Sequence, residues 1–65
     1  MATYTNVTDL VWAGGGTLID CNVTFDAIGP VPFSASPDDP EAYGREIYAR
    51  AVAGDFGPIA EEVGP

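Results

Sequence analysis

Hydrophobic and polar residues alternate most regularly between positions 17 and 27. The odd positions carry the apolar side chains Ile19, Cys21, Val23 and Phe25. The even positions carry Asp20, Asn22, Thr24 and Asp26. Successive side chains of a β-strand point to opposite faces of its sheet. The pattern therefore predicts a strand over residues 17–27 with one buried face and one solvated face.

Residues 4–13 are rich in β-branched and aromatic side chains, which predicts a second strand. The three glycines at 14–16 lie between the two segments, so we expect an antiparallel hairpin. If Asp9 faces solvent, its neighbours Thr8, Leu10 and Trp12 face the core. Directly opposed residues share a face, so this arrangement needs a turn of two or four residues. We expect a two-residue turn, Gly14-Gly15, which pairs Leu10 with Ile19 and Asp9 with Asp20.

A turn at Ile28–Pro30 precedes a short third strand, residues 31–35. Pro30 and Pro32 cannot donate hydrogen bonds to a neighbouring strand, so this strand is expected at the edge of the sheet. The pattern predicts an α+β fold, in which a three-stranded antiparallel sheet of order 1-2-3 carries one α-helix on its apolar face. At 65 residues, the chain is expected to form a single domain over residues 1–60, followed by a polar tail over residues 61–65.

The helix is expected to begin near residues 36–41 and to end near Ala53. Asp39 could cap it with Pro40 at the first helical position, or Asp38 and Glu41 could form a capping box. The buried stripe is expected to contain Tyr43, Ile47, Tyr48, Ala51 and Val52.

Three further residues or pairs explain the ends and the packing of this helix. Gly44 is unfavourable within a helix, which suggests a close approach to the sheet. Gly54 fits a C-terminal cap, and Phe56 and Ile59 are expected to fold back as a lid over the core.

Ten acidic residues face only two basic ones, Arg45 and Arg50, which gives a net charge of −8 without any lysine or histidine. Glu41 precedes Arg45 by four residues and Glu46 precedes Arg50 by four, so each arginine can form an ion pair on the helix surface. The acids then left unpaired are Asp9, Asp20, Asp26, Asp38, Asp39, Asp55, Glu61 and Glu62. Such a field repels phosphates, so direct nucleic-acid binding is not expected, and it favours a basic protein partner.

Carboxylates on alternate residues of a strand are spaced much like successive phosphates of a nucleic acid, because residues two apart lie roughly 6.6–6.8 Å apart. Asp9, Asp20 and Asp26 are expected on one solvated face of the hairpin. They could imitate a stretch of phosphate backbone, or they could simply keep an exposed sheet soluble. The candidate partner-binding residues are Asp9, Asp20, Asp26, Asp38, Asp39 and Asp55.

Other chemistry is poorly supported by the sequence. A single cysteine and the lack of histidine leave no ligand set for a metal cluster, and the acids do not follow the alternating pattern of a calcium loop. Cys21 lies among inward-facing residues with no lysine or histidine to activate it, so it is expected to be a core thiol. We therefore expect no enzyme activity, no cofactor and no metal. No apolar run is long enough to cross a membrane, and no signal peptide is expected.

The segment over residues 33–59 carries the pieces Gly-Arg-Glu-Ile-Tyr-Ala-Arg (residues 44–50) and Gly-Asp-Phe-Gly-Pro (residues 54–58). It resembles the C-terminal part of small proteins encoded by tailed bacteriophages and prophages, often near tail genes. In size and acidity the chain is also similar to anti-CRISPR proteins, several of which imitate DNA.

These resemblances imply a monomeric inhibitor in the cytoplasm of the bacterial host. Its partner would be a basic DNA-binding host protein, most concretely a subunit of a type I CRISPR effector complex. The alternative is an accessory protein for the structure or assembly of a phage tail.

Overall fold

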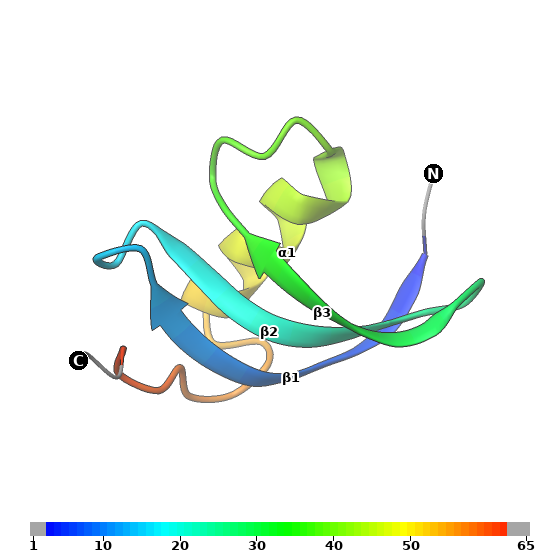
Figure 1. Ribbon diagram of the computed structural model, residues 1–65, viewed down its shortest axis with the longest axis horizontal. Coiled ribbons are helices and arrows are strands. Elements are labelled where there is room, and N and C mark those ends of the chain that lie inside the picture. Colours follow the sequence, from blue (N-terminus) through cyan, green and yellow to red (C-terminus); the bar gives the residue numbers. More distant parts are fainter. Residues whose placement is uncertain (1–2, 63–65) are drawn as a thin grey trace.

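A computed structural model describes residues 3–62 and confirms the expected fold class (Figure 1). Strands β1 (Tyr4–Ala13), β2 (Leu18–Phe25) and β3 (Gly29–Ala35) form an antiparallel sheet in the order β1-β2-β3. Helix α1 (Ala42–Val52) lies across one face of this sheet. No helix within the described range has both the length and the apolarity needed to cross a membrane.

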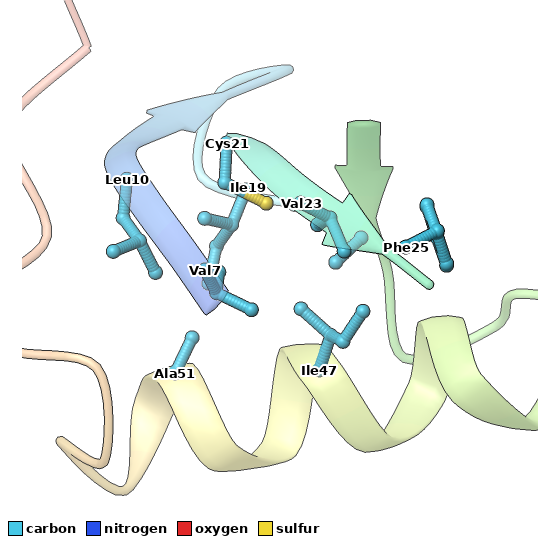
Figure 2. Close-up of a cluster of buried hydrophobic side chains, with 9 residues drawn as sticks. Val7, Leu10, Ile19, Cys21, Val23, Phe25, Ile47 and Ala51 are labelled. Atoms are coloured by element: carbon cyan, nitrogen blue, oxygen red, sulfur yellow. The ribbon is translucent and has the colours of Figure 1, made fainter. Parts of the chain in front are cut away.

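The core lies between the sheet and the helix and has the expected inward residues of β2 at its centre (Figure 2). The side chains of Ile19 and Val23 are fully buried, and they pack with Ile47 and Ala51 of α1. Tyr43 and Tyr48 are half-buried beside this cluster. Val52, however, is 55% exposed, so the predicted helix stripe was wrong at this position.

The register of the first hairpin differs from the expected one. Ala13 pairs with Leu18, so the turn contains four residues, 14–17, and Trp12 rather than Leu10 opposes Ile19. Its glycines adopt positive φ angles, and the Thr17 hydroxyl donates to the Gly14 carbonyl oxygen at 2.7 Å. The hydroxyl bond and the left-handed glycines favour this longer turn.

A β-bulge in β1 moves the inward-facing residues as well. Asp9 has a φ of 56°, and the register shifts between Thr8 and Val11. An extra residue at a bulge interrupts the alternation of side chains between the two faces. Val7 and Leu10, three residues apart, are therefore both buried, whereas Thr8 is exposed. The prediction that Thr8 faces the core was wrong.

The start of α1 also differs from both expected capping arrangements. Glu41 is the N-cap residue, and no side chain forms a capping hydrogen bond. Asp39 instead accepts a hydrogen bond from the Glu41 N–H at 2.8 Å, within the loop that precedes the helix. A Cβ atom at Gly44 would collide with the Asp39 side chain, so this glycine makes room for Asp39 rather than for the sheet.

The segment after α1 returns along the free edge of β1. Gly54, with a φ of 90°, follows the last helical turn, and the Asp55 N–H donates to the Arg50 carbonyl oxygen at 3.0 Å. This is a Schellman C-cap, as Gly54 predicted. The predicted lid is confirmed, because Phe56 and Ile59 are half-buried against the core.

Ala60 then forms a parallel bridge to Val11 through two backbone hydrogen bonds of 2.9 and 3.0 Å. Glu61 and Glu62 are exposed, and the Glu62 carboxylate accepts a hydrogen bond from the Gly15 N–H at 3.0 Å. The remainder of the predicted tail, residues 63–65, lies outside the described residues.

Candidate functional site

The sheet has an outer face, opposite to α1, that no other element of the described chain covers (Figure 1). The register places on this face the even-numbered residues of β2 and their partners on both neighbouring strands. From β2 these residues are Leu18, Asp20, Asn22 and Thr24. Their partners are Ala13, Val11, Thr8 and Asn6 on β1, and Ser34, Pro32 and Pro30 on β3.

Asp9 and Asp20 are the charged residues of the outer face, and polar neighbours hold both carboxylates in place. Asp9 Oδ2 accepts a hydrogen bond from Asn22 Nδ2 at 2.8 Å, because the bulge turns Asp9 toward the middle strand. Asp20 Oδ1 accepts a hydrogen bond from the Ser34 hydroxyl at 2.6 Å. Asp20 faces Val11 across the hairpin, not Asp9 as we expected. The two carboxylates still share one face. Asn22, which donates the hydrogen bond to Asp9, lies two residues beyond Asp20 on β2, and side chains two residues apart on a strand point to the same face.

Asp20 also borders a shallow open hollow on the outer face, between β2 and β3. Its outward-facing lining residues are Asp20, Asn22, Pro32 and Ser34. A positively charged side chain of a partner would find a carboxylate there and no competing cation from residues 3–62.

Asp26 is exposed but does not extend the row of outer-face carboxylates. It lies in the turn beyond the end of β2, where its N–H donates to the Thr3 carbonyl oxygen at 3.1 Å. The structure therefore places Asp9 and Asp20 on the same face and Asp26 at one end of the sheet.

The other three candidate acids lie outside the sheet. Asp38 is exposed in the loop before α1, and half-buried Asp39 organises that same loop. Asp55 follows the helix and forms an ion pair with Arg50, with Oδ2 3.2 Å from Nε. The prediction that Asp55 is unpaired was wrong, because the Schellman turn brings it back beside Arg50.

Both arginines belong to α1 and are bound within the molecule. Arg50 lies 3.9 Å from Glu46 as well as 3.2 Å from Asp55, donates to the Tyr4 hydroxyl at 3.0 Å and lies over the Phe56 ring. The hydrogen bonds to Tyr4 and Asp55 raise the pKa of Arg50, so it stays charged.

Arg45 does not form the expected ion pair with Glu41. Its guanidinium donates instead to the Asp39 carbonyl oxygen at 2.5 Å. Neither arginine therefore contributes positive charge to the outer face.

Cys21 points into the core from the middle strand. Its Sγ lies 3.6 Å from the Phe33 carbonyl oxygen, and burial, with a smaller effect from Asp20, raises its pKa to about 11. A thiol with so high a pKa is a poor nucleophile at neutral pH. Within residues 3–62, no three side chains of His, Cys, Asp or Glu are grouped so that they could hold a metal ion.

Besides Val52, sequence reasoning missed the exposure of Ile28 in the β2–β3 turn. The available signal was a β-branched apolar residue at a position where turns favour glycine, asparagine or aspartate.

No protein-family model matches the chain, and neither the curated proteins nor the solved structures contain a match.

Proposed function

We propose that this protein is an inhibitor that binds a basic, nucleic-acid-binding protein and occupies the surface where phosphates would lie. One observation carries the proposal: the uncovered outer face has two oriented carboxylates, Asp9 and Asp20, while both arginines are bound on the helix side. Fixed charges of one sign attract a cationic surface and repel nucleic acid.

The narrower form of the proposal names the partner as a type I CRISPR effector complex of the bacterial host. Its support is the resemblance of residues 33–59 to phage-encoded proteins, together with the net charge of −8. Such a complex must bind the phosphate backbone of its DNA target with basic side chains. An acidic sheet face can compete for those side chains without any catalytic step.

The test is a competition experiment with a purified type I effector complex and a labelled DNA target. Increasing amounts of the protein should displace the DNA, whereas the protein should not bind the DNA alone. The affinity of the protein for the effector complex, measured directly without DNA, should fall strongly between about 0.1 M and about 1 M salt, because the Debye length falls from about 10 Å to about 3 Å.

Unchanged DNA binding at saturating protein would overturn the narrower proposal. A direct affinity for the effector complex that does not depend on salt would overturn charge mimicry itself. Capture of phage tail components from an infected-cell lysate, with no effector subunit, would favour the alternative of a tail accessory protein.

A further inference from the structure

Two large hydrophobic side chains are exposed within the described residues, Ile28 at 70% and Val52 at 55%. Ile28 lies in the turn of residues 26–28, at one end of the sheet (Figure 1). Its side chain makes little contribution to the core, and a β-branched residue gives no conformational advantage in a turn. The requirements of the fold therefore do not explain an isoleucine at this position.

An apolar hollow lies directly beside Ile28, where the turn meets the first turn of α1. It is lined by Phe25, Ala27, Ile28 and Tyr43. The Tyr43 ring packs edge-on against Phe25, with centroids 5.5 Å apart, which fixes the wall of the hollow. The Tyr43 hydroxyl forms no hydrogen bond with any residue between 3 and 62. A rigid aromatic wall with a free hydroxyl group is typical of protein interfaces.

Asp26 is exposed in the same turn, and it stands between Phe25 and Ala27, both of which line the hollow. We infer that the hairpin-tip patch, defined as Asp26, Ala27, Ile28 and Tyr43, anchors the partner. The occupant would be a protein surface with an apolar side chain that enters the hollow beside cationic side chains that face Asp26. The net charge of −8 and the two internally bound arginines favour a cationic partner over an anionic one.

This inference rests on the proposed function and adds an apolar contact that slows dissociation, which charge alone does not supply. Long-range charge mainly accelerates association, whereas a desolvated apolar contact mainly slows dissociation. The outer face would thus attract the partner, and the hairpin-tip patch would hold it.

A first test needs no knowledge of the natural partner. The protein, labelled with nitrogen-15, is titrated with a short lysine-rich peptide that carries leucines, and separately with a peptide of the same charge that carries serines. The leucine peptide should bind more tightly, and its largest amide shifts should fall at residues 26–28 and 43. Equal affinity and equal shift patterns for both peptides would overturn the inference.

Two matched variants separate this patch from general surface hydrophobicity. Ile28→Ser should weaken binding of the leucine peptide about tenfold, toward the affinity of the serine peptide, because a buried isoleucine contact is lost. Val52→Ser removes the other exposed large hydrophobic side chain and should leave the affinity for the leucine peptide unchanged. Equal losses in the two variants would contradict a specific patch.

A further measurement addresses self-association, the competing use of an exposed apolar tip. Sedimentation should show a monomer for the wild type and for Ile28→Ser. A wild-type dimer that Ile28→Ser dissociates would assign the patch to a second copy of the chain and overturn the inference.

The same variants distinguish this inference from the proposed function. If the wild type displaces DNA from the effector complex and Ile28→Ser does so equally well, only the hairpin-tip inference fails. If the wild type shows leucine-dependent binding at the patch but no competition with DNA, the patch stands and the DNA-mimic proposal fails.

Discussion

The two faces of the sheet share the strand β2 but have opposite physical characters. The inner face buries Ile19, Cys21 and Val23 against α1, whereas the outer face exposes Asp20 and leaves Asn22 and Thr24 half-buried. Hydrophobic burial on the inner face stabilises the fold, and the outer face is free to carry charge. Charge and stability can therefore be changed separately in this protein, by substitutions at the even and at the odd positions of β2.

The largest expected effect is on the inner face. Ile47→Ala should lower the free energy of unfolding by about 2–5 kcal/mol, because Ile47 is fully buried between α1 and the sheet. Chemical denaturation measures this loss, which is a large fraction of the stability of a domain of this size. The control is Val52→Ala on the same helix, which should change stability by less than about 0.5 kcal/mol. Similar losses in the two variants would show that the assigned helix face is wrong.

A smaller effect is expected at the β-bulge in β1. Asp9→Val should destabilise the fold by about 1–2 kcal/mol, because a β-branched residue is strained at a φ of 56°. Asp9→Asn should be nearly neutral, because asparagine tolerates this conformation and its side-chain oxygen can still accept from Asn22. Thermal unfolding compares the two variants, and equal stability of the valine and asparagine variants would contradict the bulge.

Cys21 should have a pH-dependent effect on stability that is absent near neutral pH and develops only at high pH. Its folded pKa is raised to about 11, so the folded state retains the proton longer than the unfolded chain. The contribution of Cys21 to stability is therefore complete below about pH 9 and should decrease as pH rises toward about 11.

The measurement for Cys21 is the difference in unfolding free energy between wild type and Cys21→Ala as a function of pH. This difference cancels the titration of other groups, such as Tyr4, whose pKa burial also raises. A difference that stays constant from pH 8 to about pH 11, or rapid labelling of the folded thiol at neutral pH, would place Cys21 outside the core.

The sequence correctly predicted the features that depend on residues close together in the chain. The alternation of β2 predicted its buried face, and Gly54 predicted the helix end. The position of Asp9 was not predictable by parity, because a bulge adds one residue to the count and Asp9 is one of the few residue types that tolerate a left-handed φ. The contacts of Asp39 and Arg45 were missed because they depend on the path of the loop before α1.

The sequence predicted the acidic character of the candidate site better than it predicted the contacts of its residues. The excess of acids and the outward direction of Asp20 follow from the sequence, whereas the pairing of Asp55 with Arg50 requires the helix C-cap to be in place. The exposure of Ile28 depends on which elements pack against the β2–β3 turn, which a strand pattern does not contain.

Whether the outer face attracts a basic partner can be measured from the association rates of two charge-matched double variants. Asp9→Asn with Asp20→Asn changes the outer face, and Glu61→Gln with Glu62→Gln changes the C-terminal segment. Each pair removes two negative charges and takes the formal net charge from −8 to −6. The amide oxygens that replace the carboxylates can still accept the hydrogen bonds from Asn22, Ser34 and Gly15, so all variants should stay folded.

The outer-face pair should slow association with the purified effector complex about tenfold or more at low salt, and the C-terminal pair should slow it much less. An intact association rate in the outer-face pair, together with a slowed rate in the C-terminal pair, would show that the outer face is not the contact and assign the contact to the C-terminal segment.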